Sequence, residues 1–224
     1  YYFFNLNRFH LLYLEQSQLF LFQDKYWANL LSKPAGVSHY LAAFVTQFFV
    51  SPLVAALVVT AIGVTLFALS YSLFSKFGFV APIAALIWPL LHLAILNPVQ
   101  NHIALSVGFM LSLLSVLLFF ALKESRWQIW LAATGLPFLI FACGITGFLA
   151  TIIMTGHYLI QRKFFPALVI ITVSTLTPLL LAKFYYLYPL KSVYAAPFQF
   201  PVTTELLIAV IAGTLIFSII IWAS

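Results

Sequence analysis

The stretch Ile103-Ala-Leu-Ser-Val-Gly-Phe-Met-Leu-Ser-Leu-Leu-Ser-Val-Leu-Leu-Phe-Phe-Ala-Leu122 contains no charged residue. A helix of about twenty apolar residues crosses the hydrocarbon core of a bilayer. The whole chain of 224 residues is similar in character, with 64% hydrophobic and 6% charged residues, whereas a soluble domain has about 25% charged residues. Strands of a membrane barrel would alternate apolar and polar side chains. The sequence therefore predicts an all-α, polytopic membrane protein.

We expect seven or eight membrane segments in a single transmembrane domain over residues 1–224. An amphipathic helix over Leu19–Leu31 is expected to lie in the membrane interface after the first segment, because its apolar and aromatic residues form one stripe. The turn Ser32–Gly36 should end it. The expected membrane segments are the tail of a first helix at Tyr1–Tyr13, then Leu53–Leu73, Phe79–Leu96, Ile103–Leu122, Phe164–Tyr186 and Thr203–Trp222, with Trp127–Ile160 making up the remainder.

The region Trp127–Ile160 is long for one membrane helix and short for two. Pro137 and the run Cys143-Gly-Ile-Thr-Gly147 favour a break in its middle. Two short helices or a re-entrant hairpin would both fit. We adopt the split interpretation because it places the basic turns on one face, as expected for cytoplasmic turns: Lys76, Lys123 with Arg126, and Arg162 with Lys163.

The formal charge of +6 comes from lysines and arginines that stand singly or in pairs between apolar runs. This pattern is typical of residues that set membrane topology, and it argues against a nucleic-acid partner. We expect the protein to reside in a bacterial inner membrane, with membrane lipids around it. Because the chain begins and ends at apolar segments, we expect the natural protein to extend beyond both ends.

Sequence motifs for common chemistries are absent: there is no phosphate-binding loop, His-Glu-x-x-His pair, paired-cysteine site or nucleophile elbow. No histidine has helical spacing to another ligand, so no metal site is predicted, and the cofactor stays unknown. His92 lies within a predicted span. We expect it to bond to a neighbouring helix, with a proton relay as the alternative.

Aromatic and acidic residues gather on the predicted outer face. Tyr185, Tyr186, Tyr188 and Tyr194 are typical of an interfacial belt, with a groove for a lipid or sugar as the alternative. Two of the four acidic residues, Glu15 and Asp24, are the candidate catalytic groups, because a carboxylate can act as a general base. Asp24 can instead pair with Lys25 or cap the interfacial helix. Glu15 shares a helical face with Arg8, its natural ionic partner.

The elements Glu15-Gln-Ser-Gln-Leu-Phe20, Pro34-Ala-Gly36 and Phe44-Val-Thr-Gln-Phe48 resemble the opening of an uncharacterised family of multi-pass membrane proteins from Bacteroidota. That family opens with an acid-Gln-x-Gln-Leu-Phe element, a Pro-Gly-Gly-like turn and a Phe-Leu-Thr-Gln-Phe-like entry to the second helix. Here Ala35 and Val45 depart from the pattern. The resemblance covers residues 13–50; later segments match only in pattern.

The layout also resembles C-type membrane glycosyltransferases, whose first outer loop carries interfacial helices and an acidic catalytic residue. This resemblance implies a lipid-phosphate sugar donor, with Glu15 or Asp24 as the base. Lys33, His39 or His102 would meet the phosphate, and the polar residues Arg8, Gln18 and Gln47 are further candidates for substrate binding.

Three hypotheses for function therefore stand. The first is a glycosyltransferase-like module that uses a lipid-linked donor at the outer face. The second is a transporter or channel for a small polar or lipid substrate, with Arg8, Glu15, Gln47 and His92 lining its path. The third is a non-catalytic subunit that packs against other membrane subunits.

Overall fold

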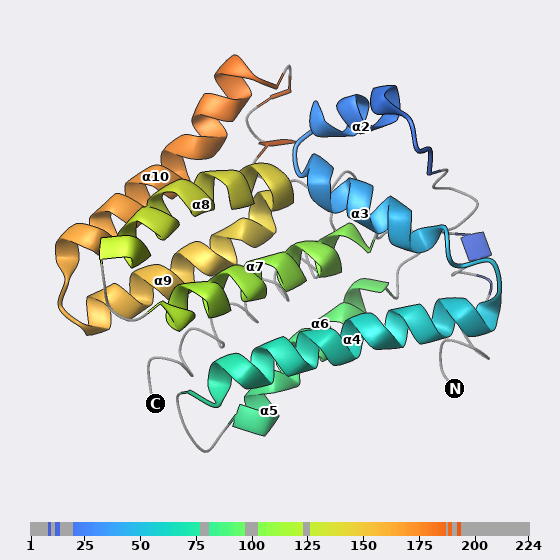
Figure 1. Ribbon diagram of the computed structural model, residues 1–224, viewed down its shortest axis with the longest axis horizontal. Helices are drawn as coiled ribbons and strands as arrows, with labels where there is room; N and C mark the ends of the chain where they lie inside the picture. Colours follow the sequence, from blue (N-terminus) through green and yellow to red (C-terminus); the bar gives the residue numbers. More distant parts are fainter. Residues whose placement is uncertain are drawn as a thin grey trace.

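The computed structural model describes residues 9, 12–13, 20–76, 81–96, 103–122, 126–186, 188–189 and 192–193. Within these residues all regular structure is helical and no strand occurs, which confirms the all-α prediction for this part of the chain. The helices are α2 (Asp24–Leu31), α3 (Gly36–Thr46), α4 (Pro52–Phe74), α5 (Ala81–Ala85), α6 (Ile87–Leu96), α7 (Ala104–Ala121), α8 (Arg126–Cys143), the 3-10 turn η2 (Gly144–Thr146), α9 (Gly147–Ile160) and α10 (Phe164–Phe184) (Figure 1).

Four helical stretches in the described part are long and apolar enough to cross a membrane, namely Pro52–Phe74, Ala104–Ala121, Trp127–Ile160 and Phe164–Phe184. They match four of the expected segments. The expected last segment, Thr203–Trp222, lies outside the described residues, as does most of Tyr1–Tyr13. Seven or eight membrane segments were predicted, and the described residues establish four candidates for them.

The expected span Phe79–Leu96 is not one continuous helix. It forms α5 and α6, which are separated by a turn at Leu86. Pro89 provides the physical reason: it has no N–H to donate to the carbonyl of Ala85, and its ring crowds that carbonyl, so the helix breaks in the preceding turn. The apolar helical stretch Pro82–Leu93 is too short to count among the four candidates.

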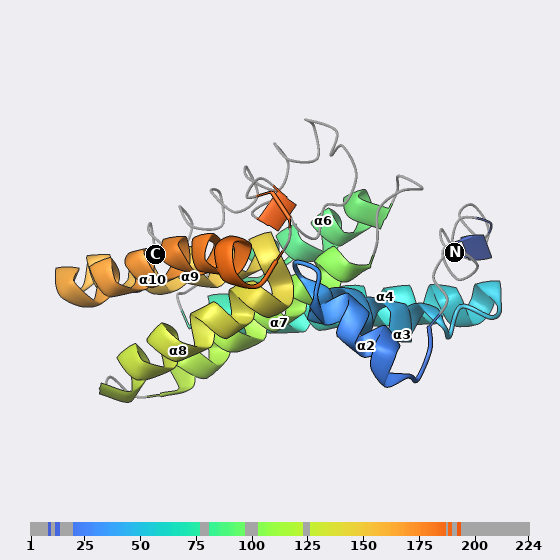
Figure 2. The same ribbon diagram turned by 90° about the horizontal axis from the view of Figure 1, so that it is seen from above.

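The region Trp127–Ile160 consists of two helices, α8 and α9, and the chain reverses direction between them (Figures 1 and 2). The reversal occurs at Gly144, which has a positive φ of 61°. At the start of α9, a Cβ on Gly147 would lie 3.2 Å from the backbone of Ile140 on α8. The expected break is therefore real. Pro137, however, lies inside α8 and does not end it.

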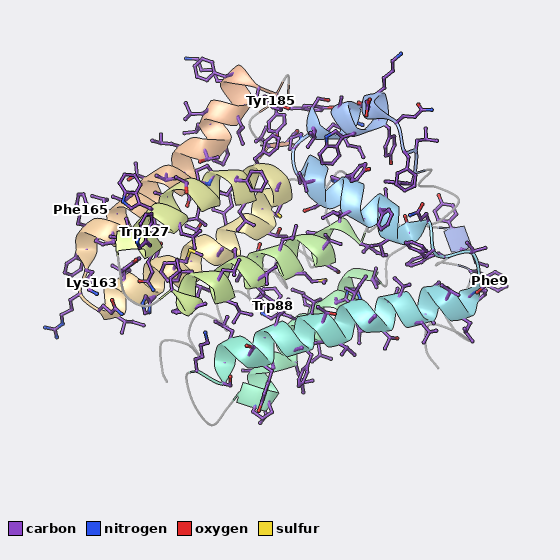
Figure 3. The ribbon with its side chains drawn as sticks, in the orientation of Figure 1. Phe9, Trp88, Trp127, Lys163, Phe165 and Tyr185 are labelled. Carbon is purple, nitrogen blue, oxygen red and sulfur yellow. The ribbon has the colours of Figure 1, made fainter. Side chains whose placement is uncertain are left out.

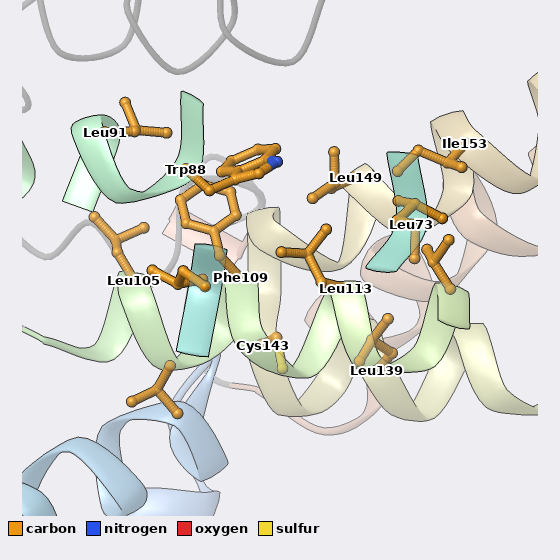
Figure 4. Close-up of a cluster of buried hydrophobic side chains, with 14 of the residues drawn as sticks. Leu73, Trp88, Leu91, Leu105, Phe109, Leu113, Leu139, Cys143, Leu149 and Ile153 are labelled. Carbon is orange, nitrogen blue, oxygen red and sulfur yellow. The ribbon is translucent and has the colours of Figure 1, made fainter. Parts of the chain in front are cut away.

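Helix α7 forms the centre of the bundle and packs against α3, α4, α8 and α9. In its most apolar stretch, 56% of α7 is buried inside the protein. The corresponding share is 28% for α4 and 33% for α10, so those two helices lie at the periphery. Figure 4 shows the core around α7, where Phe109 lies against Trp88 of α6 with ring centroids 4.5 Å apart. Leu113 of α7 and Leu139 of α8 are buried in the same cluster.

Side chains at one end of the bundle connect α4, α7, α8 and α9. Lys76, just after α4, places its Nζ 5.8 Å from the ring centroid of Phe120 on α7. Gln128 of α8 donates to the carbonyl of Phe119, and the Phe119 ring contacts Tyr158 of α9. The turn carrying Lys163 lies at this end too (Figure 3). The described basic turns therefore share one end, as the sequence predicts, while Lys123 lies outside the described residues.

The interfacial helix is shorter than predicted, because α2 begins at Asp24 and residues 20–23 are not helical. The turn before α3 is tight. Ala35 has a left-handed backbone, with φ 58°, and a Cβ at Gly36 would clash with the carbonyl of Leu30. A Pro-Gly-Gly-like turn would place a glycine at the left-handed position, where this chain has Ala35.

We predict that the two ends of the bundle face opposite sides of a membrane, so that single-cysteine variants divide into two accessibility classes. In a Cys143→Ala background, Lys76→Cys and Lys163→Cys should react with an impermeant maleimide from the same side of sealed vesicles. Asp24→Cys should react from the other side. Labelling of all three from one side would contradict this arrangement.

A second prediction concerns the turn between α2 and α3. Gly36→Ala should lower the free energy of unfolding by about 1–3 kcal/mol, because the new methyl group overpacks the Leu30 carbonyl. Ala35→Gly should raise it by about 0.5 kcal/mol, since relief of the left-handed strain exceeds the added chain entropy. Both changes can be followed by thermal exposure of Cys143, the single, buried cysteine. Equal effects of the two substitutions would argue against this turn geometry.

Candidate functional site

The structure describes four of the eight residues predicted for the site. Asp24 is the first residue of α2 and is exposed. Lys33 lies in the turn before α3, His39 lies on α3, and Gln47 directly follows α3; all three are half-buried. The other four lie outside the described residues, namely Arg8, Glu15, Gln18 and His102.

An aromatic seam joins α2 and α3. We define it as Phe20, Phe22, Tyr26, Trp27, Tyr40, Phe44 and Phe48. Phe20 lies 5.5 Å from Phe44, and Trp27 lies 4.5 Å from Tyr40, measured between ring centroids. Because earlier residues of one segment meet later residues of the other, α2 and α3 lie antiparallel. Parts of the seam are exposed, with Phe22 at 77% and Phe48 at 46%, so its aromatic surface is only partly covered.

The antiparallel pairing decides which candidates come together. Phe22 and Phe48 both contact Phe44, which places Asp24 and Gln47 towards the same end of the pair. Lys33 lies at the opposite end of α2. That helix has eight residues, so it is about 12 Å long. Asp24 and Lys33 therefore occupy separate ends of the seam and do not form one compact charged site.

The electrostatics of the seam are simple. Asp24 is the one acidic residue in the described part of the chain, and it lies in the first turn of α2, where the helix dipole stabilises a negative charge. Burial, and then the neighbouring Tyr40, raise the pKa of Tyr26 above its usual value of 10. Tyr26 therefore remains a neutral phenol near pH 7. No group of three or more His, Cys, Asp or Glu side chains suited to a metal occurs within the described ranges.

His92 is a buried link between three helices. Its Nε2 lies 3.2 Å from the carbonyl oxygen of Val59 on α4, and its Nδ1 lies 2.6 Å from the hydroxyl of Ser106 on α7. Since a carbonyl only accepts, Nε2 donates and Nδ1 accepts from Ser106. The expected bond to a neighbouring helix is present. The accepting carbonyl is that of Val59 on α4. It is not the carbonyl of Ala85, which Pro89 leaves without a donor.

The tip of the α8–α9 hairpin, Cys143–Gly147, is a polar junction inside the bundle. The Ser112 hydroxyl of α7 lies 2.8 Å from the carbonyl oxygens of both Thr146 and Gly108. From the other side, the Ser38 hydroxyl of α3 donates to the carbonyl of Ala142 at 3.1 Å. Gly108 lets the Thr146 side chain approach α7 closely, since a Cβ there would clash with it. Two other elements, α7 and α3, therefore satisfy the backbone where the chain reverses.

Helix α9 is shorter than the hydrocarbon core of a bilayer is thick. Helix α9 has 14 residues, so it is about 21 Å long, whereas the hydrocarbon core is about 30 Å thick. The tip lies level with Gly108 and Ser112, which are in the second and third turns of α7. Helix α3 covers the tip. The seam is thereby connected to the α8–α9 hairpin through Ser38 of α3.

Sequence reasoning missed this junction as a feature. The available signals were Gly108 and Ser112, which are four residues apart and therefore share one face of α7. Small and hydroxyl residues at this spacing favour close helix packing in membranes. Nothing in the sequence, however, pairs Ser112 with Thr146 or Ser38 with Ala142, because these contacts join residues 34 and 104 positions apart.

Comparison with known proteins gives one match. The model of a family of unknown function, DUF6057, matches residues 1–224. No curated protein and no solved structure matches the chain.

We predict that Gly108→Ala lowers the free energy of unfolding by about 1–3 kcal/mol, because the methyl group meets Thr146. Gly135→Ala on α8 is the matched control. A Cβ at Gly135 meets no atom within 4 Å, so this substitution should stabilise the protein by about 0.4–1 kcal/mol. Thermal exposure of Cys143 measures both, and adding Thr146→Ala should recover part of the Gly108→Ala loss. Equal stability of the two glycine variants would rule out the contact between the tip and α7.

Proposed function

The chain belongs to DUF6057, a family of unknown function, and we propose that it is a glycosyltransferase-like membrane enzyme that uses a lipid-linked sugar donor. The proposal places it in a bacterial inner membrane, with the α2–α3 pair at the outer face. The observation that carries it is the partly exposed aromatic seam, which lies beside polar candidates and directly before the membrane helix α4.

The placement of the seam suits a substrate that enters from the lipid phase. Aromatic side chains are favoured at the membrane interface, where one side is apolar and the other is wet. Phe22 and Phe48 present exposed apolar surface, while Asp24 and Gln47 provide polar groups at the same end. A lipid chain would lie along the aromatic surface, and its polar head would be held beside the carboxylate.

The chemistry requires a base and a group that binds phosphate. A carboxylate, Asp24 or Glu15, would take the proton from the acceptor hydroxyl. The acceptor oxygen would then attack the anomeric carbon of the sugar, and the bond from that carbon to the phosphate oxygen would break, so that the lipid phosphate leaves. Lys33, His39 and His102 are the proposed partners of the phosphate, with Arg8, Gln18 and Gln47 as further polar contacts.

The described interior favours this hypothesis over transport through His92. Both ring nitrogens of His92 are engaged by α4 and α7, and the side chain is 1% exposed. A residue that lines a transport path would need contact with water or substrate. No specific contact in the described residues favours the role of a non-catalytic subunit.

The proposal predicts a loss of transfer when the base is removed. Membranes that contain the full-length protein would be supplied with radiolabelled polyprenyl-phosphate sugars, and transfer of label to an acceptor would be measured. One of the two variants Asp24→Asn and Glu15→Gln removes the base. That variant should reduce turnover by about 10²–10⁴-fold without changing the thermal exposure of Cys143. Lys25→Gln, a change at the neighbouring exposed residue, is the control and should retain activity. Full activity in the Asp24→Asn, Glu15→Gln double variant would exclude both carboxylates.

A further inference from the structure

Tyr186 is a buried phenol whose hydroxyl has no acceptor among the residues that the structure describes. It follows α10, its side chain is 3% exposed, and its hydroxyl oxygen has no hydrogen-bond partner among the described residues. Leaving a buried polar group unpaired costs about 1–3 kcal/mol, and phenylalanine would fill similar space without that cost. The described part of the chain therefore gives this hydroxyl no role in folding.

The surroundings of Tyr186 are aromatic. Its ring stacks on Phe141 of α8, with centroids 6.2 Å apart and an interplanar angle of 7°. The edge of Tyr185 meets the Tyr186 ring at 5.1 Å and the Phe141 ring at 5.5 Å. Tyr185 is 52% exposed, so this cluster extends from a buried phenol to the protein surface. Figure 3 places Tyr185 at the end of α10 that is remote from Lys163.

The charges at this cluster favour a neutral ligand. Burial, and then the neighbouring Tyr185, raise the pKa of Tyr186 above its usual value of 10, so the hydroxyl remains a neutral donor near pH 7. Lys183, one turn earlier, places its Nζ 5.3 Å from the ring centroid of Phe184, a residue that is 74% exposed. The ammonium group therefore lies at the exposed side of α10, away from the buried phenol.

From these observations we infer that Phe141, Tyr185 and Tyr186 form a binding site for a neutral, hydroxyl-bearing ring such as a sugar. The apolar face of the ring would lie against the aromatic side chains, and one of its oxygens would accept the hydrogen bond from Tyr186. Pockets for small ligands are commonly apolar with a few placed polar groups. The site involves no residue of α2 or α3, so it does not depend on transfer chemistry at the seam.

The test uses the full chain in phosphatidylcholine nanodiscs, so that no glycoside detergent competes for the site. Thermal exposure of Cys143 to a thiol-reactive dye reports unfolding, and the probes are methyl β-D-glucopyranoside and inorganic phosphate. The glucoside at saturation should raise Tm by about 2–4 °C, and phosphate should leave it unchanged. If phosphate alone raises Tm, or if neither probe raises it, the inference is overturned.

The variant Tyr186→Phe gives the decisive comparison. Without a probe it should raise Tm by about 2–4 °C, because the unpaired hydroxyl is gone, and it should abolish the response to glucoside. Tyr185→Phe, which changes an exposed hydroxyl, is the matched control for Tm without a probe and should leave that value unchanged. A fall in Tm for Tyr186→Phe would mean that the hydroxyl has a structural partner, and would overturn the inference. Phe141→Leu keeps the hydroxyl of Tyr186. It should raise the glucoside concentration required for the Tm shift at least threefold.

Discussion

The fold depends on satisfying backbone polar groups where the chain reverses inside the bundle. Lipid offers no hydrogen bonds, so irregular backbone in the hydrocarbon region is tolerated only inside protein or beside water. The turn between α8 and α9 meets this condition through side chains of two other elements: Ser112 reaches the carbonyl of Thr146, and Ser38 reaches that of Ala142. The central position of α7 and the placement of α3 over the tip both follow from this requirement.

The same logic extends through the rest of the interior. His92 connects α6 to α4 and α7, and Thr151 of α9 bonds to Ser174 of α10 at 2.9 Å. Hydrophobic surface cannot drive helices together in lipid, because the tails are as apolar as the side chains, so packing and hydrogen bonds do so instead. In the described part of the chain, each of these bonds ties a peripheral helix to its neighbours.

Much of this architecture can be predicted from the sequence. Helix α7 matches the expected span Ile103–Leu122 to within a residue at each end, because a long uncharged run has no alternative in a membrane. The split of Trp127–Ile160 was predictable from Gly144 and Gly147. The break at Leu86 was not predicted, although Pro89 explains it, because prolines in membrane helices often persist without a break, as Pro137 does.

The candidate site was less predictable. The rarity of acidic residues singles out Asp24, and the resemblance to glycosyltransferases adds Lys33, yet composition does not reveal that α2 separates them. That separation depends on the antiparallel pairing of α2 with α3, which is set by contacts such as Phe20 with Phe44. Tyr186 was assigned to a belt with other tyrosines. Its burial against Phe141 joins residues 45 positions apart, and no local pattern encodes that contact.

The shortness of α9 has a consequence for how the protein is made. A segment of 14 apolar residues is too short to be held across a bilayer by itself. Helices α8 and α9 pack against each other, and the tip of that pair is completed by α3 and α7. Both of these helices precede the hairpin along the chain and are synthesised before it. The two helices that contact the hairpin tip are therefore synthesised before the hairpin itself.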